Sequence, residues 1–363
     1  MSEERRQLRA AVRAALERHR SPRENLGRGP DLDAWAVLAG EVGVSGLLVP
    51  GGLGGTGGSY ADAAVVFEEA GRTLAPLPLM STVGLATSVL LACDGSIAAP
   101  LRRIADAAVA TVAMGRGISA VPAGDRGALY GSDDSVLDGA AAELLVARAD
   151  TPEGVGLFAV GSDAAGLRRR RLESLDLTRS LARVEFDSTP AVLVARGEHA
   201  DAALSVGVDL AIALWAAESV GAMRQCLAAA VEYAKQRVQF ARPIGSFQAI
   251  KHKLVDVLLE VEMAQSSADL AVAAADDWLR APGERTRTAL GVAASSAKAA
   301  CAQAFVFAAE ETLHVSGGIG FTWEHDAHLY FRRAKFAELY LGSVDEHRDR
   351  VARLSGLGTA LVT

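Results

Sequence analysis

The feature of this sequence that most restricts its fold is a change in hydrophobic periodicity, which occurs twice along the chain. Between residues 107 and 196, short segments rich in Val, Leu and Phe are separated by Gly, Asp, Ser and Pro. The segments are AVATVAM, SVLDG, ELLVARA, GVGLFAV and LARVEFD. This pattern is typical of strands joined by turns. Before and after it, apolar residues recur at helical spacing. We therefore expect a small β domain between two helical regions.

In the N-terminal region, Ser59 is followed three residues later by Asp62, which predicts a capping box for a helix that ends before Pro76. In the C-terminal region, a long helix should start at Gln248 and end before Pro282-Gly283. Its apolar residues predict one buried face: Ile250, Leu254, Val257, Leu258 and Val261.

Three further C-terminal helices are expected, over residues 284–314 and 324–340 and after a capping box at Ser343 and Glu346. The predicted class is thus α+β, mostly α. We expect a helical domain over 1–100, a shortened β domain over 101–197 and a helical bundle over 198–363.

Composition narrows the functional class. Half of the residues are hydrophobic, 22% are charged and the net charge is -7, so we expect a globular protein that does not bind nucleic acid. The four arginines at 168–171 indicate a solvated strand or loop, with a phosphate or partner contact as the alternative. The three cysteines are far apart, which fits a reducing cytosol. With a charged N-terminus and no apolar run of about 20 residues, we expect a cytoplasmic protein without a membrane span.

Two motifs carry little functional weight. Residues 52–57 match the G-x-G-x-x-G pattern, but their surroundings are helical, so a surface loop is favoured over a dinucleotide site. His325 and His328 are three residues apart without a distant third ligand, which favours ordinary polar contacts over a metal site.

The segment YAKQRVQFARPIGSFQ, residues 233–248, is more informative. One helix runs in with basic residues near its end, the chain breaks at Pro243-x-Gly245, and a new helix starts near Gln248. The backbone N–H groups of that start, with Arg237 nearby, are able to hold a pyrophosphate. A helix hairpin whose basic residues favour the helix C-terminus explains the same pattern. For the glycines at 317–320, close approach of the backbone to a ligand and a plain turn are also both open.

Together, YAKQRVQFARPIGSFQAIKH, HVSGGIGFTWEHDAHLYFRRAK and the three-domain order resemble the acyl-CoA dehydrogenase family. The resemblance covers most of the chain and is weakest over about 100–200. It implies a C-terminal four-helix bundle, FAD bound between subunits and assembly as dimers of dimers. The implied reaction is α,β-dehydrogenation of an acyl-CoA thioester. A carboxylate removes the α proton, a hydride goes to the flavin, and an electron-transfer flavoprotein accepts the electrons.

The resemblance also assigns cofactor-binding residues. Arg237 and Gln248 would contact the phosphate or adenosine side of FAD across a subunit boundary, and Phe240 would pack there. Gly317 and Gly318 would let the backbone approach the cofactor. His314 stands where many members carry Gln, and Ser343 matches a residue that touches FAD. No metal is implied.

The catalytic base is missing from both positions that the family uses. Leu341 stands where most members carry glutamate, and Ala211 stands where a second subgroup carries its base. An apolar side chain cannot accept a proton. Family segments beside the flavin ring, Leu-Thr-Glu-Pro and Trp-Ile-Thr, are also absent from the middle domain. Glu338, one turn before Leu341, is the first substitute candidate, and Glu218 is another.

Three hypotheses follow. The first is a base-lacking subunit of a heterotetramer, which completes the FAD site for a base-bearing partner that acts on a bulky or steroid side-chain CoA thioester. The second is a homomeric dehydrogenase with a relocated base such as Glu338. The third is a non-catalytic scaffold or acyl-CoA-binding subunit.

Overall fold

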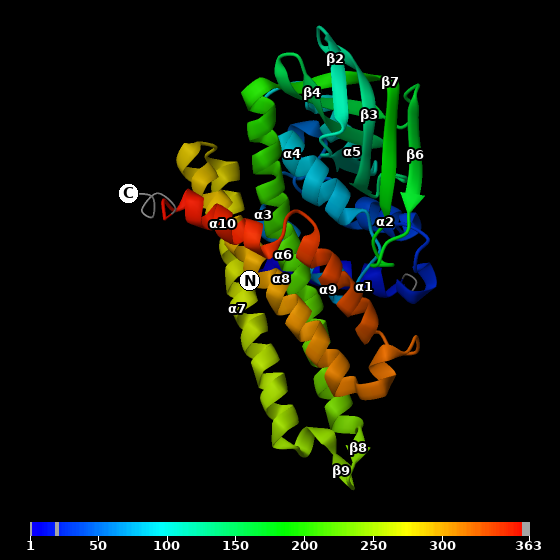
Figure 1. Ribbon diagram of the computed structural model, residues 1–363, viewed down its shortest axis with the longest axis vertical. Helices are drawn as coiled ribbons and strands as arrows, with labels where there is room; N and C mark the ends of the chain where they lie inside the picture. Colours follow the sequence, from blue (N-terminus) through cyan, green and yellow to red (C-terminus); the bar gives the residue numbers. More distant parts are fainter. Residues whose placement is uncertain (1, 19–21, 358–363) are drawn as a thin grey trace. The chain divides into compact units, whose positions relative to one another are not determined.

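The computed structural model describes residues 2–18 and 22–357 (Figure 1). The chain divides into two compact units. The first comprises residues 1–66 and 76–211, and the second comprises residues 67–75 and 212–363. The expected order of helices, strands and helices is confirmed. The division into three domains at residues 100 and 197 stays a prediction.

Helical elements precede the sheet, as the periodicity predicts. They are α1 (Glu3–Arg18), η1 (Pro22–Asn25), α2 (Leu32–Val37), η2 (Leu38–Val42), η3 (Gly51–Leu53), α3 (Tyr60–Arg72), η4 (Met80–Thr87), α4 (Ser88–Leu91) and α5 (Ala98–Ala105). The predicted capping box at the start of α3 is present. The Ser59 amide donates to Asp62 Oδ2 at 3.0 Å, and the Asp62 amide donates to Ser59 Oγ at 3.1 Å.

A seven-stranded sheet forms the β region. Its strands are β1 (Ala110–Ala113), β2 (Ile118–Ala123), β3 (Arg126–Leu137), β4 (Leu144–Thr151), β5 (Gly154–Gly161), β6 (Leu167–Leu172) and β7 (Leu181–Arg196). The order is β1-β4-β2-β3-β7-β5, and β6 pairs with β7. Because β5 also pairs with β4, five of the strands form a closed circuit. The four arginines lie on β6, and Arg168, Arg170 and Arg171 are exposed, so the predicted strand is confirmed, while the alternative of a phosphate contact stays open.

The second unit is built from long helices. α6 (Gly197–Gln236) enters it from the first unit, and a short hairpin of β8 (Val238–Gln239) and β9 (Arg242–Pro243) follows. The remaining elements are η5 (Ile244–Ser246), α7 (Gln248–Arg280), α8 (Glu284–Ser316), η6 (Gly317–Phe321), α9 (Ala327–Leu339) and α10 (Val344–Leu354). The predicted break at Pro282-Gly283 and the capping box of Ser343 with Glu346 are both confirmed.

One part of the predicted inner face of α7 is wrong. Val257 and Val261 are buried, and Ile250 and Leu254 are half-buried, but Leu258 is 43% exposed. The buried face continues from Val261 through Ala264 and Ala268, at intervals of three to four residues. Leu258 follows Val257 directly and therefore points about 100° away from that line.

Among residues 2–18 and 22–357, two helices are long and apolar enough to cross a membrane by composition alone: α6 and the stretch from Glu284 to Phe321. In both, most of the apolar window is buried inside the fold, 72% and 61% respectively. This burial is typical of helices in the core of a globular fold, where apolar side chains pack against other parts of the protein.

Candidate functional site

A small apolar cluster joins three helix ends in the second unit. Ala230 and Ala234 near the end of α6 pack with Val315 near the end of α8. Partly buried side chains from η5 and the start of α7 pack against them, among them Ile244, Ile250 and Leu254. Figure 1 shows this end of the unit beside β8 and β9. The cluster brings the segments that carry Arg237, Gln248, His314, Gly317 and Gly318 to one end of the bundle.

The first turn of α7 is open to an anion. Its N-cap residue, Phe247, makes no side-chain hydrogen bond to the helix, and the turn contains no acidic residue. The first N–H groups of a helix have no acceptor within it and carry the positive end of the helix dipole. Gln248 is exposed and its Nε2 lies 3.4 Å from His252 Nε2. Arg237 is exposed just beyond the end of α6. These groups suit a phosphate.

Phe240 lies at the tip of the β8–β9 hairpin and is 88% exposed. Phe240 and Ala241 both have left-handed backbones, with φ of 51° and 63°. This matches the turn that two-residue hairpins require, although glycine or asparagine is usual there. The Phe240 and Phe247 rings are nearly perpendicular, with 6.0 Å between their centroids, and the Arg242 guanidinium carbon lies 4.0 Å from the centroid of the Phe247 ring. So exposed an aromatic side chain suits contact with a second molecule.

His314 is held by a carboxylate. Its Nδ1 lies 3.1 Å from Glu311 Oε1, while Lys253 Nζ donates to Glu311 Oε2 at 2.5 Å. Burial raises the pKa of Glu311, but the hydrogen bonds from Lys253 and His314 outweigh that effect and lower the pKa below its ordinary value. The His314 side chain is 60% exposed, so the opposite ring nitrogen, Nε2, is left to contact a ligand.

The glycines after α8 face open space. Gly317 has φ of 62°, a conformation that favours glycine. A Cβ atom on Gly317 or Gly318 would meet nothing within 4 Å. Packing within the described residues therefore does not require glycine at position 318, and the backbone there is open to close approach.

Ser343 lies elsewhere in the unit. Its side chain forms the α10 capping box with Glu346, with Oγ donating to Glu346 Oε2 at 2.8 Å. The nearby end of α9 is bound by Lys298 of α8, whose Nζ donates to Ala337 O at 2.5 Å. The rise of an α-helix puts Lys298 roughly 24 Å from His314 along α8. Within one chain, the structure thus brings together six of the seven predicted cofactor residues, with Ser343 apart.

The turn at residues 341–342, where the family carries its base, is fixed by a contact with His347, although Leu341 itself is apolar. Leu341 has φ of 62°, and its carbonyl oxygen lies 2.8 Å from His347 Nε2. A Cβ atom on Gly342 would lie 2.8 Å from the same His347 nitrogen, so only glycine fits there. Ala211 is fully buried in α6. Neither side chain can take up a proton.

The substitute carboxylates are both engaged. Glu338 is half-buried and forms an ion pair with Lys335. Glu218 lies 3.4 Å from Arg333, and both side chains are almost fully buried. The contacts of each carboxylate are those of a structural ion pair.

Sequence reasoning missed Lys298. This side chain is fully buried, lies 4.3 Å from the Trp215 ring, and supports the end of α9 from inside the bundle. Burial lowers its pKa to about 8, against smaller opposing effects of Cys301 and Glu338. The signal was a single lysine in the run AASSAKAACAQAF, whose neighbours are otherwise small or apolar.

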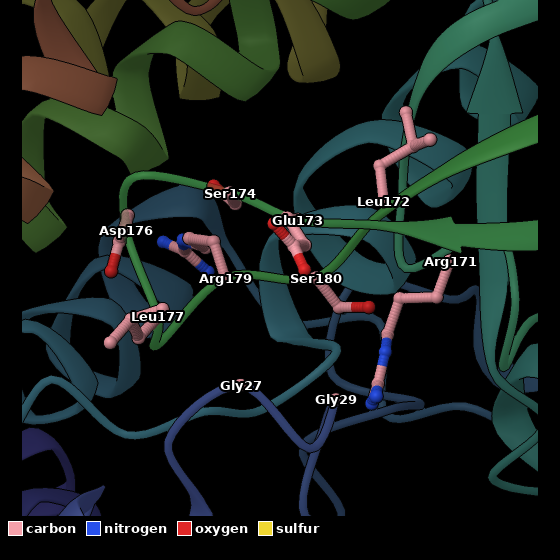
Figure 2. A pocket seen from close by; sticks show the side chains of 10 residues that line it. All are labelled: Gly27, Gly29, Arg171, Leu172, Glu173, Ser174, Asp176, Leu177, Arg179 and Ser180. Carbon is pink, nitrogen blue, oxygen red and sulfur yellow. The ribbon is translucent and has the colours of Figure 1, made fainter.

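A pocket of about 510 Å³ lies within the first unit (Figure 2). It is lined by Gly27 and Gly29, by the last two residues of β6, Arg171 and Leu172, and by most of the loop that joins β6 to β7. Thr178 and Arg179 lie in the loop beside this pocket. Thr178 forms a turn, because its amide and hydroxyl donate to Asp176 Oδ1 at 2.9 and 2.6 Å. Arg179 lines the pocket.

Comparisons with known proteins agree with this architecture. Residues 2–97 match the description "Acyl-CoA dehydrogenase, N-terminal domain" and residues 210–355 match "Acyl-CoA dehydrogenase, C-terminal domain". The chain is 36% identical over 340 residues to acyl-CoA dehydrogenase IpdE2 of Mycobacterium tuberculosis, which covers 92% of this chain and 91% of that protein. It is 33% identical to IpdE2 of Mycolicibacterium smegmatis, with 97% and 98% covered.

Solved structures give the same result. A variant of the Tcur3481–Tcur3483 steroid ACAD is 30% identical with a TM-score of 0.85, and 99% of each chain is covered. The ChsE4–ChsE5 complex from Mycobacterium tuberculosis is 24% identical with a TM-score of 0.85 over 98% of each chain, which supports the fold.

Proposed function

Because this chain belongs to the acyl-CoA dehydrogenase family of oxidoreductases, we propose that it is a subunit that completes the FAD site of a base-bearing partner. The observation that carries the proposal is the pair Leu341 and Ala211. Both family base positions are apolar, while the turn around Leu341 is held in place by His347. A chain that has lost its proton acceptor but kept the surrounding scaffold is suited to assist another active site.

The end of the second unit fits the phosphate side of FAD. The α7 N–H groups and Arg237 would bind the phosphates, and the Gly317-Gly318 backbone would lie against the cofactor. His314, held through Nδ1 by Glu311, would present Nε2. FAD, when bound, supplies the acceptor for the hydride that leaves the acyl-CoA thioester. The residues of this chain would hold and orient it and exclude water, while the partner's carboxylate removes the α proton.

Association has its own support. Four apolar side chains of α7 that are more than half exposed recur at intervals of four and seven residues, which places them along one side of the helix. They are Val255, Leu259, Met263 and Leu270. A row of exposed apolar side chains of this kind indicates a protein interface. The ChsE4–ChsE5 structure is a complex of two named chains. We therefore infer assembly with a second acyl-CoA dehydrogenase-like subunit. From the family membership, we also propose an electron-transfer flavoprotein as electron acceptor.

The proposed substrate is the CoA thioester of a bulky acyl group such as a steroid side chain. This rests on the similarity to the steroid ACAD and on the absence of the family's flavin-ring segments from the middle domain, which would leave room for a large substrate. We also propose a cytoplasmic location, since the three cysteines are free thiols and are all buried.

The visible absorption spectrum tests the proposal. We expect the chain purified alone to lack flavin bands, and the chain co-expressed with its partner to bind about one FAD per unlike pair. Stoichiometric flavin and full dehydrogenase activity in the chain alone would instead support a homomeric enzyme. Protein that is colourless both alone and with the partner would support the scaffold hypothesis.

The homomeric alternative requires a base, for which Glu338 is the nearest candidate. Its carboxylate is already engaged in an ion pair with Lys335. We expect Glu338→Gln to leave reduction of the flavin by substrate unchanged. If this variant abolishes reduction while its flavin content stays normal, the base has been relocated to Glu338.

A further inference from the structure

The pocket of the first unit has two polar groups that converge on one point. Arg171 extends from the end of β6, and Ser180 lies just before β7 (Figure 2). A Cβ atom placed on Gly29 would lie 3.6 Å from Arg171 Nη1 and 4.0 Å from Ser180 Oγ. Gly29 has no such atom, and its φ of 104° favours glycine. The Arg171 guanidinium and the Ser180 hydroxyl therefore both lie beside Gly29, so one group bound next to this glycine would be able to contact both.

Neither group is used by the fold. Ser180 is 6% exposed, and its Oγ is buried without a hydrogen-bond partner. A buried hydroxyl without a partner is unfavourable, and in most proteins such a group contacts a ligand or water. Within residues 2–18 and 22–357, the Arg171 guanidinium makes no ion pair, whereas Arg168 of the same strand pairs with Glu185 and Asp187.

The other charged groups of the pocket are placed differently. The Asp176 carboxylate, which is buried, accepts both the amide and the hydroxyl of Thr178. Arg179 is 8% exposed, so it belongs to the pocket wall. Glu173 is exposed and lines the same pocket, so its carboxylate disfavours a ligand with a high negative charge and favours one with a hydrogen-bond donor.

We propose that this pocket binds a small organic oxyanion, the carboxylate or phosphate group of a metabolite, between the Arg171 guanidinium and the Ser180 hydroxyl. A guanidinium and a hydroxyl are both able to donate to one oxyanion, and the guanidinium fork matches carboxylate and phosphate geometry. The volume of about 510 Å³ exceeds what one such group needs and suits a small metabolite.

Calorimetric titration of the full chain with its partner tests the proposal, using inorganic phosphate and acetate as separate probes in an uncharged buffer. We expect saturable binding of at least one probe at one site per chain. Tighter phosphate binding would identify a phosphate-type site, and tighter acetate binding a carboxylate-type site. We expect Arg171→Gln to weaken binding by about tenfold or more, and Ser180→Ala by roughly two- to tenfold.

Arg170→Gln is the matched control. Arg170 is the adjacent residue of β6, is also exposed, and does not line the pocket, so the same loss of charge there should leave binding unchanged. Glu173→Gln should tighten phosphate binding more than acetate binding, because phosphate carries the larger charge.

Three results would overturn the proposal. These are no saturable binding of either probe, equal weakening by Arg170→Gln and Arg171→Gln, and binding that Arg237→Gln abolishes. The last result would place the anion at the α7 N-terminus instead. Flavin content measured on the same samples separates this outcome from a failure of the proposed cofactor role.

Discussion

Because of Lys298, the free energy of unfolding is expected to change with pH in the alkaline range. The charged side chain is fully buried, and burial lowers its pKa to about 8 from 10.5. Between these two values the unfolded chain holds more protons than the folded chain, so the free energy of unfolding rises with pH. Below about pH 8 lysine is protonated in both states and contributes no pH dependence.

We expect the unfolding free energy of the natural protein, relative to Lys298→Met, to rise by up to about 1.4 kcal/mol per pH unit between pH 8 and 10.5. Urea unfolding at a series of pH values measures the difference. Lys335→Met, which removes a half-exposed lysine of α9, is the control and should show no such slope. A difference that stays constant with pH would contradict the assignment.

Arg237 provides a prediction for the proposed cofactor. If its guanidinium contacts a phosphate, Arg237→Gln should weaken flavin binding by roughly 10- to 100-fold, the loss expected for a charged hydrogen bond. Lys235→Gln removes a nearby exposed charge of α6 and should have little effect. The flavin dissociation constant of the assembled protein, measured by fluorescence, checks both. Equal effects of the two variants would indicate that flavin binding depends on the net positive charge near the end of α6 and not on a specific contact of Arg237.

At the scale of elements, α10 depends on its capping box. Ser343 Oγ accepts from the Glu346 amide at 3.4 Å, and the Glu346 carboxylate accepts from the Ser343 amide at 2.8 Å. Hydrogen exchange of the α10 amides should show that Ser343→Ala destabilises the helix by about 1 kcal/mol. Ser343→Thr keeps the acceptor and should be nearly neutral. Unchanged protection in the alanine variant would mean that packing on α8 alone holds the helix.

The helices and strands of the sequence were predictable where local signals agree. Both capping boxes and the break at Pro282-Gly283 combine a residue preference with a change in periodicity, and the structure has all three. The face of α7 was partly wrong at Leu258, because an apolar residue next to a buried one cannot be assigned to a face by composition. The exposed position of Leu258 depends on tertiary packing, which periodicity only approximates.

At the scale of the whole molecule, α7 is expected to hold the assembly together. Leu259→Glu places a charge among apolar side chains that are more than half exposed, and burying an unpaired charge is strongly unfavourable. Size-exclusion chromatography should show a smaller species for this variant. Leu259→Met, which keeps volume and apolar character, should assemble normally. An unchanged elution volume for the glutamate variant would place the interface elsewhere.

The sequence motifs predicted the segments of the proposed cofactor site, but they did not predict the contacts of Lys298 or Arg171. Arg237, Gln248 and Gly317 lie in continuous motifs, and the structure brings their segments together. Lys298 with Trp215, and Arg171 with Gly29, are pairs that are distant in sequence. Neither pair has a local pattern, since each depends on how separate elements pack. Such pairs can be identified only from the three-dimensional structure.

The exposed hairpin at residues 238–243 also has a consequence for handling the protein. It joins two long helices, and its tip residue Phe240 has little cover from its own chain. Trypsin should cut after the exposed Arg237, whereas Pro243 protects the bond after Arg242. A cofactor or partner resting on the hairpin would block the first cut. The rate of tryptic cleavage, followed by gel electrophoresis, would then show what fraction of the protein has bound cofactor and partner. No activity assay is needed.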